Sequence, residues 1–164
     1  MLIPKKQQHI LKMKIFFIIL IFIYSSSKIM AGELKLVRPD PSLSPKDVVR
    51  IVVKALKNND LPRKNNGVKI TFSFASPANK RNTGPFKRFN TMIRGQTYLP
   101  MINHRGATYE NYNVTDAQAS IDVILISSTG KTFGYRFRLT RQNGNKYEGS
   151  WMTDAVTPIQ VTVL

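Results

Sequence analysis

Two residues of this chain could together transfer protons, namely His104 and Asp154. A carboxylate next to an imidazole orients the ring and stabilises its charged form, which is what an acid/base pair requires. Both residues also have an ordinary structural explanation, in which His104 caps a loop and Asp154 accepts hydrogen bonds from backbone amides at the end of a strand. We expect the structural role, with His104 at the rim of a pocket rather than at its centre.

Aromatic and basic side chains widen the set of candidate ligand contacts. The set comprises Tyr98, His104, Arg105, Tyr109, Tyr135 and Trp151. Trp151 can stack on a planar ligand, although a single Trp in a strand more often packs in a core. Arg136 and Arg138 can bind phosphate, but they alternate with aromatic residues in a predicted strand, so we expect them to face solvent.

The composition argues against a metal site or a cofactor. The chain has no Cys, and His104 is the only His outside the N-terminal segment, so neither a thiolate site nor a multi-His zinc site is expected. The nine acidic residues are spread singly along the chain, which disfavours an all-carboxylate site. No phosphate-binding loop, no G-x-G-x-x-G and no G-x-S-x-G motif is present.

Residues 1–31 have the order of a secretory signal. Lysines at positions 5, 6, 12 and 14 precede an apolar run over 15–24, and three serines follow it. The run is about half of the ~20 residues that a membrane-spanning helix needs, so we expect a cleaved signal, with an uncleaved anchor as the alternative. Translation from Met30 would instead delete the segment and leave a cytosolic protein. The pattern predicts export to a periplasm, a lumen or the medium.

The remaining chain suits one basic domain. It is part of a 164-residue sequence with 42% hydrophobic residues, and removal of residues 1–31 leaves 20 basic and nine acidic residues, a net charge of +11. Such a charge permits contact with phosphate, anionic lipid or an acidic partner. The basic residues are scattered, and no aromatic-plus-basic recognition motif is present. We therefore expect nucleic-acid binding to be weak and independent of sequence, and membrane contact only through the N-terminal segment.

A helix over 44–59 is the first element that must position these residues. Ser44 can cap it, Pro45 suits the first helical position, and Asp47 completes the spacing of a capping box. Its predicted apolar face consists of Val48, Ile51, Val52, Ala55 and Leu56. Residues 32–43 are expected to be a flexible lead-in.

The stretch from Val68 to Phe74 permits two interpretations. Apolar residues at every second position predict a strand, whereas Val68, Phe72 and Ala75 would share one face of a helix. The run is too short for its periodicity to decide, and Pro77 ends the element in either case.

A second helix is predicted to start at Thr83 or Gly84 and to end at Gly95, with Pro85 inside it. Its buried stripe is expected to be Phe86, Phe89 and Ile93. A short helical turn should follow over 98–102.

The rest of the chain predicts antiparallel strands. The expected ranges are 107–112, 119–127, 132–141 and 147–153, with an edge strand or tail over 159–164. Asn143-Gly144 is a strong signal for a hairpin turn between the last two full strands. Helices followed by a meander of strands predict an α+β fold in which the N-terminal helices pack on one face of a curved antiparallel sheet.

Several segments resemble a bacterial and plant family known as domain of unknown function 4864. They are FASPANK and TGPFKRF within Phe74–Met92, NHR at Asn103–Arg105, and WMTD at Trp151–Asp154. The order of elements also resembles the nuclear transport factor 2-like cone fold, and the resemblance covers roughly 44–158. It implies a helix over Lys64–Ala75 and a pocket between the helices and the concave sheet face. In enzymes of that superfamily an Asp, His or Tyr in the pocket transfers protons, whereas many other members only bind.

These observations predict an exported protein with a single cone-like domain over 44–164 and a role in binding without catalysis. Its partner would be a small apolar or anionic ligand in the pocket, or a protein or second copy of the chain on the sheet. One alternative is a metal-free isomerase or hydrolase that uses His104 and Asp154. Another is a basic surface module for nucleic acid or anionic lipid. An open pocket with converging polar groups would favour the enzyme, and a contiguous stripe of Arg and Lys would favour the basic module.

Overall fold

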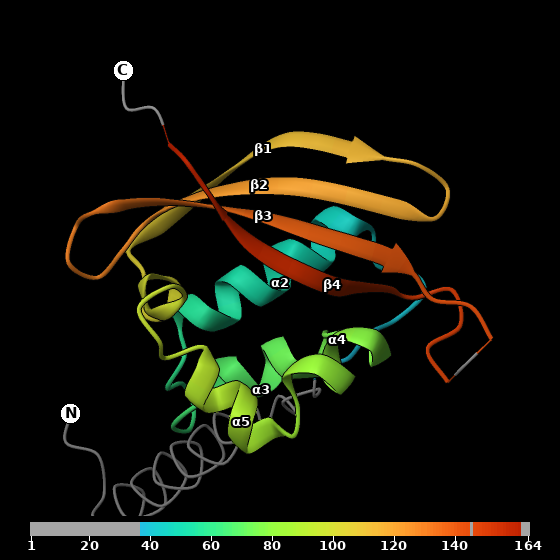
Figure 1. Cartoon of the computed structure of the whole chain (residues 1–164), viewed down its shortest axis with the longest axis horizontal. Coiled ribbons are helices and arrows are strands. Elements are labelled where there is room, and N and C mark those ends of the chain that lie inside the picture. The colour runs from blue at the N-terminus through green and yellow to red at the C-terminus, as the bar shows by residue number, and fades with distance from the viewer. Residues whose placement is uncertain (1–36, 145, 162–164) are drawn as a thin grey trace, which may run out of the picture. The chain divides into compact units, whose positions relative to one another are not determined.

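A computed structural model of the chain describes residues 37–144 and 146–161 (Figure 1). The predicted signal over 1–31 lies outside the described residues. The elements are α2 (Pro45–Lys57), α3 (Asn66–Ser73), α4 (Pro77–Thr83), α5 (Phe86–Met92), the 3-10 turn η1 (Leu99–Met101), β1 (Gly106–Val114), β2 (Gln118–Ile126), β3 (Thr132–Arg141) and β4 (Trp151–Ile159). The order of helices and strands confirms the predicted α+β fold. Within the described ranges, each helix is too short or too polar to cross a membrane.

The first helix, α2, begins where the sequence predicts. The hydroxyl of Ser44 accepts a hydrogen bond from the N–H of Asp47 at 3.2 Å, and the Asp47 carboxylate accepts one from the N–H of Ser44 at 3.2 Å. The buried side of α2 is wider than predicted and includes Val48, Val49, Val52, Val53 and Leu56. The reason is that α2 contacts the sheet on one side and α3 on the other, so two faces of the helix are covered.

The ambiguous stretch forms the helix α3, so the strand interpretation is wrong and the helix implied by the family resemblance is confirmed. Tertiary contacts hold α3 against α2. Gly67 lies so close to α2 that an added Cβ would come within 2.1 Å of the carbonyl oxygen of Ala55. The N–H of Gly67 donates to the carbonyl of Asn59 at 2.9 Å, and the Asn59 side-chain oxygen accepts from the N–H of Val68 at 3.1 Å.

The structure has two short helices in this region, α5 within the predicted range and α4 before it, where no helix was predicted. Pro77 begins α4 instead of only ending the preceding element, because the Ser76 hydroxyl accepts a hydrogen bond from the N–H of Asn79 at 3.1 Å and caps the new helix. Thr83 is the last residue of α4, not the start of the next helix. Pro85 has an extended backbone and precedes α5 rather than lying inside it, since proline lacks the N–H that a helix interior requires.

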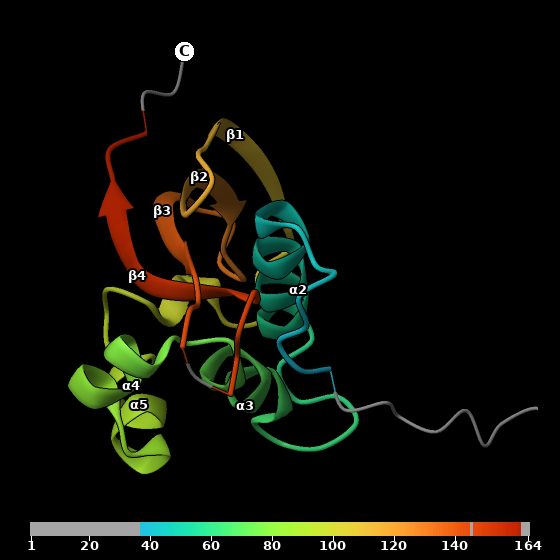
Figure 2. The same cartoon turned by 90° about the vertical axis from the view of Figure 1, so that its right-hand side faces the viewer.

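The four strands form one antiparallel sheet in the order β1-β2-β3-β4. Figures 1 and 2 show a curved sheet with α2 along one face, while α3, α4 and α5 lie on the β4 side. Core side chains alternate along β3, where Tyr135, Phe137 and Leu139 are buried and Arg136 and Arg138 are exposed. The predicted alternation of this strand is therefore confirmed.

The last strand differs most from the prediction. It begins at Trp151 rather than at 147 and continues through Pro158 to Ile159. Proline is tolerated because β4 is an edge strand, so its missing N–H faces no second strand. The connection from β3 is longer than a two-residue turn at Asn143-Gly144, since the N–H of Gln142 donates to the carbonyl of Ser150 at 2.9 Å.

Candidate functional site

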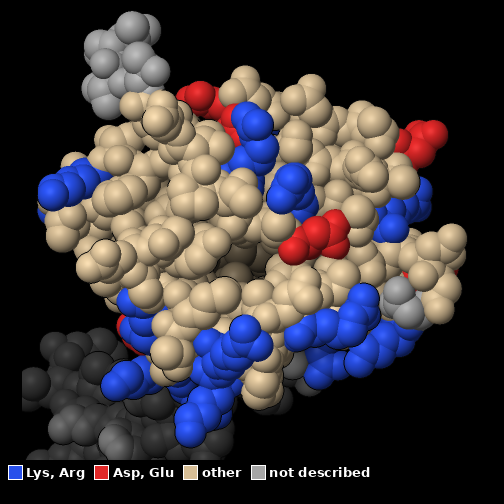
Figure 3. Space-filling view, viewed as in Figure 1, with Lys and Arg blue, Asp and Glu red and all other residues tan. Residues whose placement is uncertain are grey.

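A pocket of about 280 Å³ lies between the helices and the C-terminal half of the sheet. Its apolar wall is formed by Val52, Leu56, Phe89, Ile93, Met101, Phe137 and Val156. Figure 3 shows a hollow near the centre of this face of the molecule, between the sheet and the helices below it. The volume lies just below the range of about 300–1,000 Å³ that is typical of small-molecule sites, which limits any occupant to a small molecule.

A β-bulge positions Asp154 at this pocket. Thr153 pairs with Leu139 and Ala155 pairs with Arg138, so Asp154 is an extra residue of β4 without a partner in β3. A bulge bends the strand and redirects a side chain, and bulges are common beside active and binding sites. Asp154 lines both the pocket and a second hollow of about 520 Å³, which is formed with residues 113–115, 118–120 and 138–140. Asp154 therefore lies at the edge of the pocket that adjoins the second hollow, and we call this edge the mouth of the pocket.

Backbone hydrogen bonds fix β4 immediately before the bulge. The N–H of Thr153 donates to the carbonyl of Phe74 at 2.9 Å, and the carbonyl of Thr153 accepts from the N–H of Ser76 at 2.9 Å. The same carbonyl accepts from the Asn79 side-chain amide at 3.1 Å. These contacts cover the edge of β4 at Thr153 and join it to the start of α4. The pocket opens along the strand just after this junction.

The carboxylate of Asp154 has no hydrogen bond or ion pair with any residue in 37–144 or 146–161, and the side chain is half-buried. The contrast is Asp122 on β2, whose carboxylate accepts from Arg136 Nε at 2.7 Å and from the Asn111 amide at 2.9 Å. The hydrogen bond from Arg136 is the main cause that lowers the pKa of Asp122. Asp154 is thus the acidic residue of the pocket lining, and its hydrogen-bonding capacity is open to a ligand.

The other polar groups of the pocket are neutral. Tyr98 donates its hydroxyl proton to the carbonyl of Val156 at 3.0 Å, so this hydroxyl is already engaged. Asn82, Thr83 and Thr157 add polar atoms from α4 and β4. Among the described residues, no Lys or Arg lines this pocket. The site combines an apolar interior with one carboxylate at its mouth.

The structure places His104 away from this site. The residue is only 4% exposed, which corrects the expectation of a rim position. Its Nδ1 lies 2.9 Å from the carbonyl oxygen of Met101, so Nδ1 carries the proton and donates it. Burial lowers the pKa of His104. The loop turns inward because Asn103 adopts a left-handed backbone and donates its N–H to Leu56 at 2.9 Å.

His104 and Asp154 are therefore not assembled as a pair. His104 is absent from the pocket lining, and no hydrogen bond joins it to Asp154 within the part of the chain that the structure describes. The acid/base geometry that the sequence suggested requires such a bond. Burial and the contact with Met101 agree with a structural role for this histidine.

Of the other predicted contact residues, only Tyr98 lines the pocket. Tyr135 is buried in the core, where its hydroxyl donates to the carbonyl of Thr97 at 2.8 Å, and burial raises its pKa to about 12. Trp151 is also buried, and Tyr109 lies on β1 with Arg50 5.7 Å from its ring centre. Arg105 is exposed and donates to the carbonyl of Ser128 at 3.0 Å.

Sequence reasoning missed the wall contributed by α4 and by the second half of β4. The residues concerned are Asn79, Asn82, Thr83, Ala155, Val156 and Thr157. Ser76 followed by Pro77 is a sequence signal for a helix start and could have predicted α4. No residue pattern near Asp154 predicts the bulge. In the described ranges, no three acidic or histidine side chains are grouped in a way that could hold a metal ion.

Comparison with known proteins adds a family and no activity. A family model described as "Domain of unknown function (DUF4864)" matches residues 44–162. The match spans every element from α2 to β4 and all residues that line the pocket. No curated protein and no solved structure matches the chain. Placement in the nuclear transport factor 2-like superfamily remains a prediction from the resemblance.

Proposed function

We propose that this chain, which belongs to the family described as Domain of unknown function (DUF4864), binds a small, mainly apolar molecule that carries a hydrogen-bond donor or a positive charge. The apolar part would occupy the pocket between the helices and β4. The donor would contact Asp154 at the mouth. The observation that carries the proposal is the unpaired carboxylate of a bulged residue beside an apolar cavity of about 280 Å³.

The chemistry of the lining favours a donor over an anion. A carboxylate is acceptor-only when ionised, so it binds N–H, O–H or ammonium groups and repels another carboxylate or a phosphate. No cation lines the pocket among the described residues, so an anionic ligand would meet Asp154 without compensation. The sequence left an apolar or an anionic ligand open, and the pocket supports the apolar one.

The expected energetics follow from these two parts. Burial of the apolar body supplies most of the affinity, at roughly 25 cal/mol per Å² of apolar surface removed from water. A hydrogen bond to a charged group contributes about 1.5–3 kcal/mol net, which corresponds to about tenfold or more in affinity. An amine should therefore bind at least about tenfold more tightly than the same hydrocarbon without its amino group.

A matched ligand series tests the proposal. Amines, alcohols and carboxylates that share one small hydrocarbon body would be titrated against the wild type and Asp154→Asn, with affinities measured by calorimetry or ligand-observed NMR. The control is Asp116→Asn, which removes the same charge from an exposed residue after β1 that does not line the pocket. We expect amines to bind best, Asp154→Asn to lose about tenfold in amine affinity, and the control to behave as wild type.

A second pair of variants tests the location. Val156→Phe places a ring in the pocket, whereas Ile124→Phe places the same ring at a half-buried residue of a hollow on the other sheet face. We expect Val156→Phe to abolish binding of the whole series and Ile124→Phe to retain it. The strongest binding by carboxylates, or binding that survives Val156→Phe, would contradict the proposal.

Catalysis by the pair His104 and Asp154 is not favoured, because Nδ1 of His104 is engaged with Met101 and no bond links the two residues within the described ranges. The same variants separate binding from catalysis. Turnover of a bound compound by the wild type, lost in Asp154→Asn while the compound still binds, would replace the binding role by an enzymatic one.

A further inference from the structure

The part of the helical layer formed by α3, α4, α5 and η1 carries basic residues and no acidic ones. No Asp or Glu occurs between Asp60 and Glu110, a segment that contains α3, α4, α5 and η1. We use the name basic helical surface for six of the exposed cations in this segment: Lys64, Lys69, Arg81, Lys87, Arg88 and Arg94. Single basic residues look scattered along the sequence, but the absence of acids concentrates positive charge on this layer.

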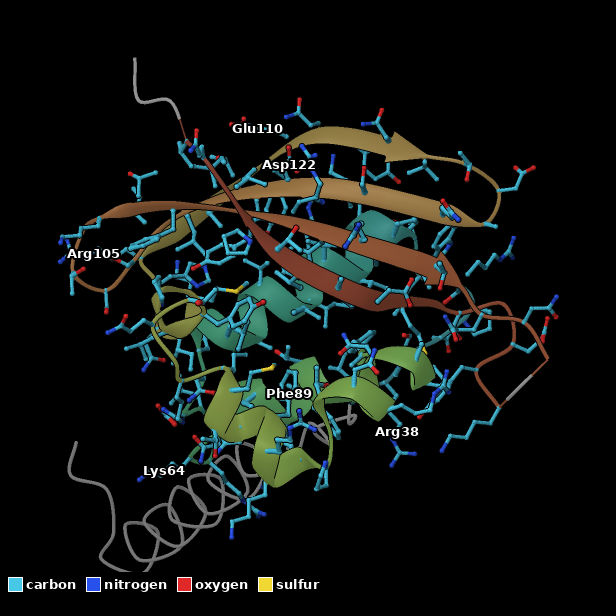
Figure 4. All side chains as sticks on the ribbon, viewed as in Figure 1. Arg38, Lys64, Phe89, Arg105, Glu110 and Asp122 are labelled. Atoms are coloured by element: carbon cyan, nitrogen blue, oxygen red, sulfur yellow. The ribbon has the colours of Figure 1, made fainter. Side chains whose placement is uncertain are left out.

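The charge is segregated in space as well. Figure 3 shows Lys and Arg side chains gathered along the lower part of the molecule, over α4 and α5. Figure 4 places Lys64 on this side and places Glu110 and Asp122 on the opposite side, at β1 and β2. The ion pair found in the described ranges joins Arg136 to Asp122 on the sheet. None of the six cations takes part in it. None of the six is therefore neutralised in an ion pair within these ranges, and Arg94 donates a hydrogen bond to the side-chain oxygen of Asn65.

Apolar side chains protrude from the same acid-free segment. Leu61 is 67% exposed, Leu99 is 49% exposed and Met92 is 38% exposed. The aromatic rings of the layer are buried or half-buried instead, and Phe72 packs on Phe89 with ring centres 5.0 Å apart. Cations combined with exposed aliphatic residues are typical of surfaces that rest in the headgroup region of a bilayer. Single-stranded nucleic acid is usually held by exposed rings that stack on bases, and this layer presents none.

We propose that the basic helical surface binds anionic membranes peripherally. Its Lys and Arg side chains contact phospholipid phosphates, and Leu61, Met92 and Leu99 enter the boundary between headgroups and acyl chains. This membrane contact is different from the one predicted for the N-terminal segment. It also does not depend on a ligand in the pocket. Each cation held near an anionic surface contributes about fivefold to the partition coefficient.

Vesicle binding of the full-length protein tests this inference. Flotation is measured with neutral phosphatidylcholine vesicles and with anionic vesicles that contain about one third phosphatidylglycerol. The readout is the ratio of binding to the anionic vesicles over binding to the neutral ones. Any contribution of the N-terminal segment to this ratio is common to all variants. The test variant is Arg81→Gln, Lys87→Gln and Arg88→Gln combined. We expect its ratio to fall by about tenfold to a hundredfold, and we expect about 1 M salt to abolish the wild-type preference.

The matched control combines Arg105→Gln, Lys131→Gln and Arg138→Gln. It removes two Arg and one Lys, as the test variant does, from exposed residues outside α3, α4 and α5. Figure 4 places Arg105 at the turn between β2 and β3, away from the basic helical surface. We expect this variant to keep most of the wild-type ratio, because the removed cations would not face the membrane.

An uncharged pair tests the apolar contribution. Leu61→Ser should lower binding to anionic vesicles severalfold, whereas Ile126→Ser, at a residue of the sheet that is 45% exposed, should not.

Equal losses in the two charge variants would show that net charge, not this surface, drives binding and would overturn the proposal. A wild type without preference for anionic vesicles would also overturn it. So would tighter binding of short RNA than of vesicles that is lost in the test variant.

Discussion

Gly67→Ala should destabilise the protein, although alanine is the better helix former. Gly67 lies in α3, where the change alone would stabilise the helix by about 1 kcal/mol. The contact with α2 opposes this gain, since the new Cβ would lie 2.1 Å from the Ala55 carbonyl oxygen and 2.8 Å from the Cα of Asn59. Both are backbone atoms, so no side chain can rotate away, and the two helices must separate.

The cost can be estimated from what that separation breaks. Overpacking costs about 1–3 kcal/mol, and the hydrogen bonds from Gly67 and Val68 to Asn59 contribute about 1 kcal/mol each. After the gain in helix propensity, we expect a net loss of about 2–4 kcal/mol in the free energy of unfolding. The measurement is urea denaturation at constant pH, with circular dichroism as the signal.

Gly106→Ala is the matched control. An added Cβ at Gly106 meets no atom within 4 Å, and this residue lacks the positive φ that would strain alanine. We expect a change of less than about 1 kcal/mol, with stabilisation the favoured sign. A stabilised Gly67→Ala would mean that propensity outweighs packing at this position, and it would refute the close approach of α2 and α3.

Three further perturbations separate the core from the titrating groups. Phe89→Ala should lower the free energy of unfolding by about 3 kcal/mol, which is the low end for a buried ring because Phe89 borders an existing pocket. The control Phe86→Ala, at a half-buried residue, should cost less, and thermal melts measure both. His104 is buried with a lowered pKa, so its neutral form is favoured in the native state and stability should fall as the pH drops below about 6.5. His104→Asn should flatten that slope in denaturant titrations between pH 7 and pH 5. Asp122 has a lowered pKa, so its stabilisation is complete above its ordinary value of 3.8 and is lost as the pH falls through the lower native value. Asp122→Asn should therefore be less stable than wild type at neutral pH, and a gap that does not shrink in acid would contradict this reasoning.

Elements with complete local signals could be predicted from the sequence. Ser44, Pro45 and Asp47 specify the start of α2 through contacts within four residues, and the structure has the same capping box. The alternation of β3 likewise depends only on neighbouring residues, and its bounds of 132–141 are those predicted. Local chemistry suffices where the interaction that defines an element lies inside the element.

Elements decided by distant contacts could not be predicted in this way. The helix α3 depends on the approach of Gly67 to α2, which no periodicity in Val68–Phe74 reveals. Pro77 was predicted only to end an element, but a proline can also start a helix, and Pro158 shows that it can lie in an edge strand. Which of these applies depends on the neighbours that the fold supplies.

The candidate site shows the same division. Asp154 could be singled out by its residue type. Its position at the pocket, however, depends on the register shift between β3 and β4, and that shift is set by the pairing of the two strands rather than by residues next to Asp154. His104 was misplaced because its partner is the carbonyl of Met101 in η1, and a backbone partner leaves no mark in the sequence. The acid-free stretch between Asp60 and Glu110 was readable from the start, since it requires only a count.

The junction between Thr153 and the start of α4 also has a consequence for the order of biosynthesis. The helices α4 and α5 have seven residues each, which is too short for stability in isolation, and β4 is the last strand of the sheet to leave the ribosome. Until β4 emerges, the carbonyl of Phe74 and the N–H of Ser76 lack the partners that Thr153 supplies. The pocket and its carboxylate therefore form together, only after β4 has been synthesised, and a nascent chain that stops before Trp151 has neither.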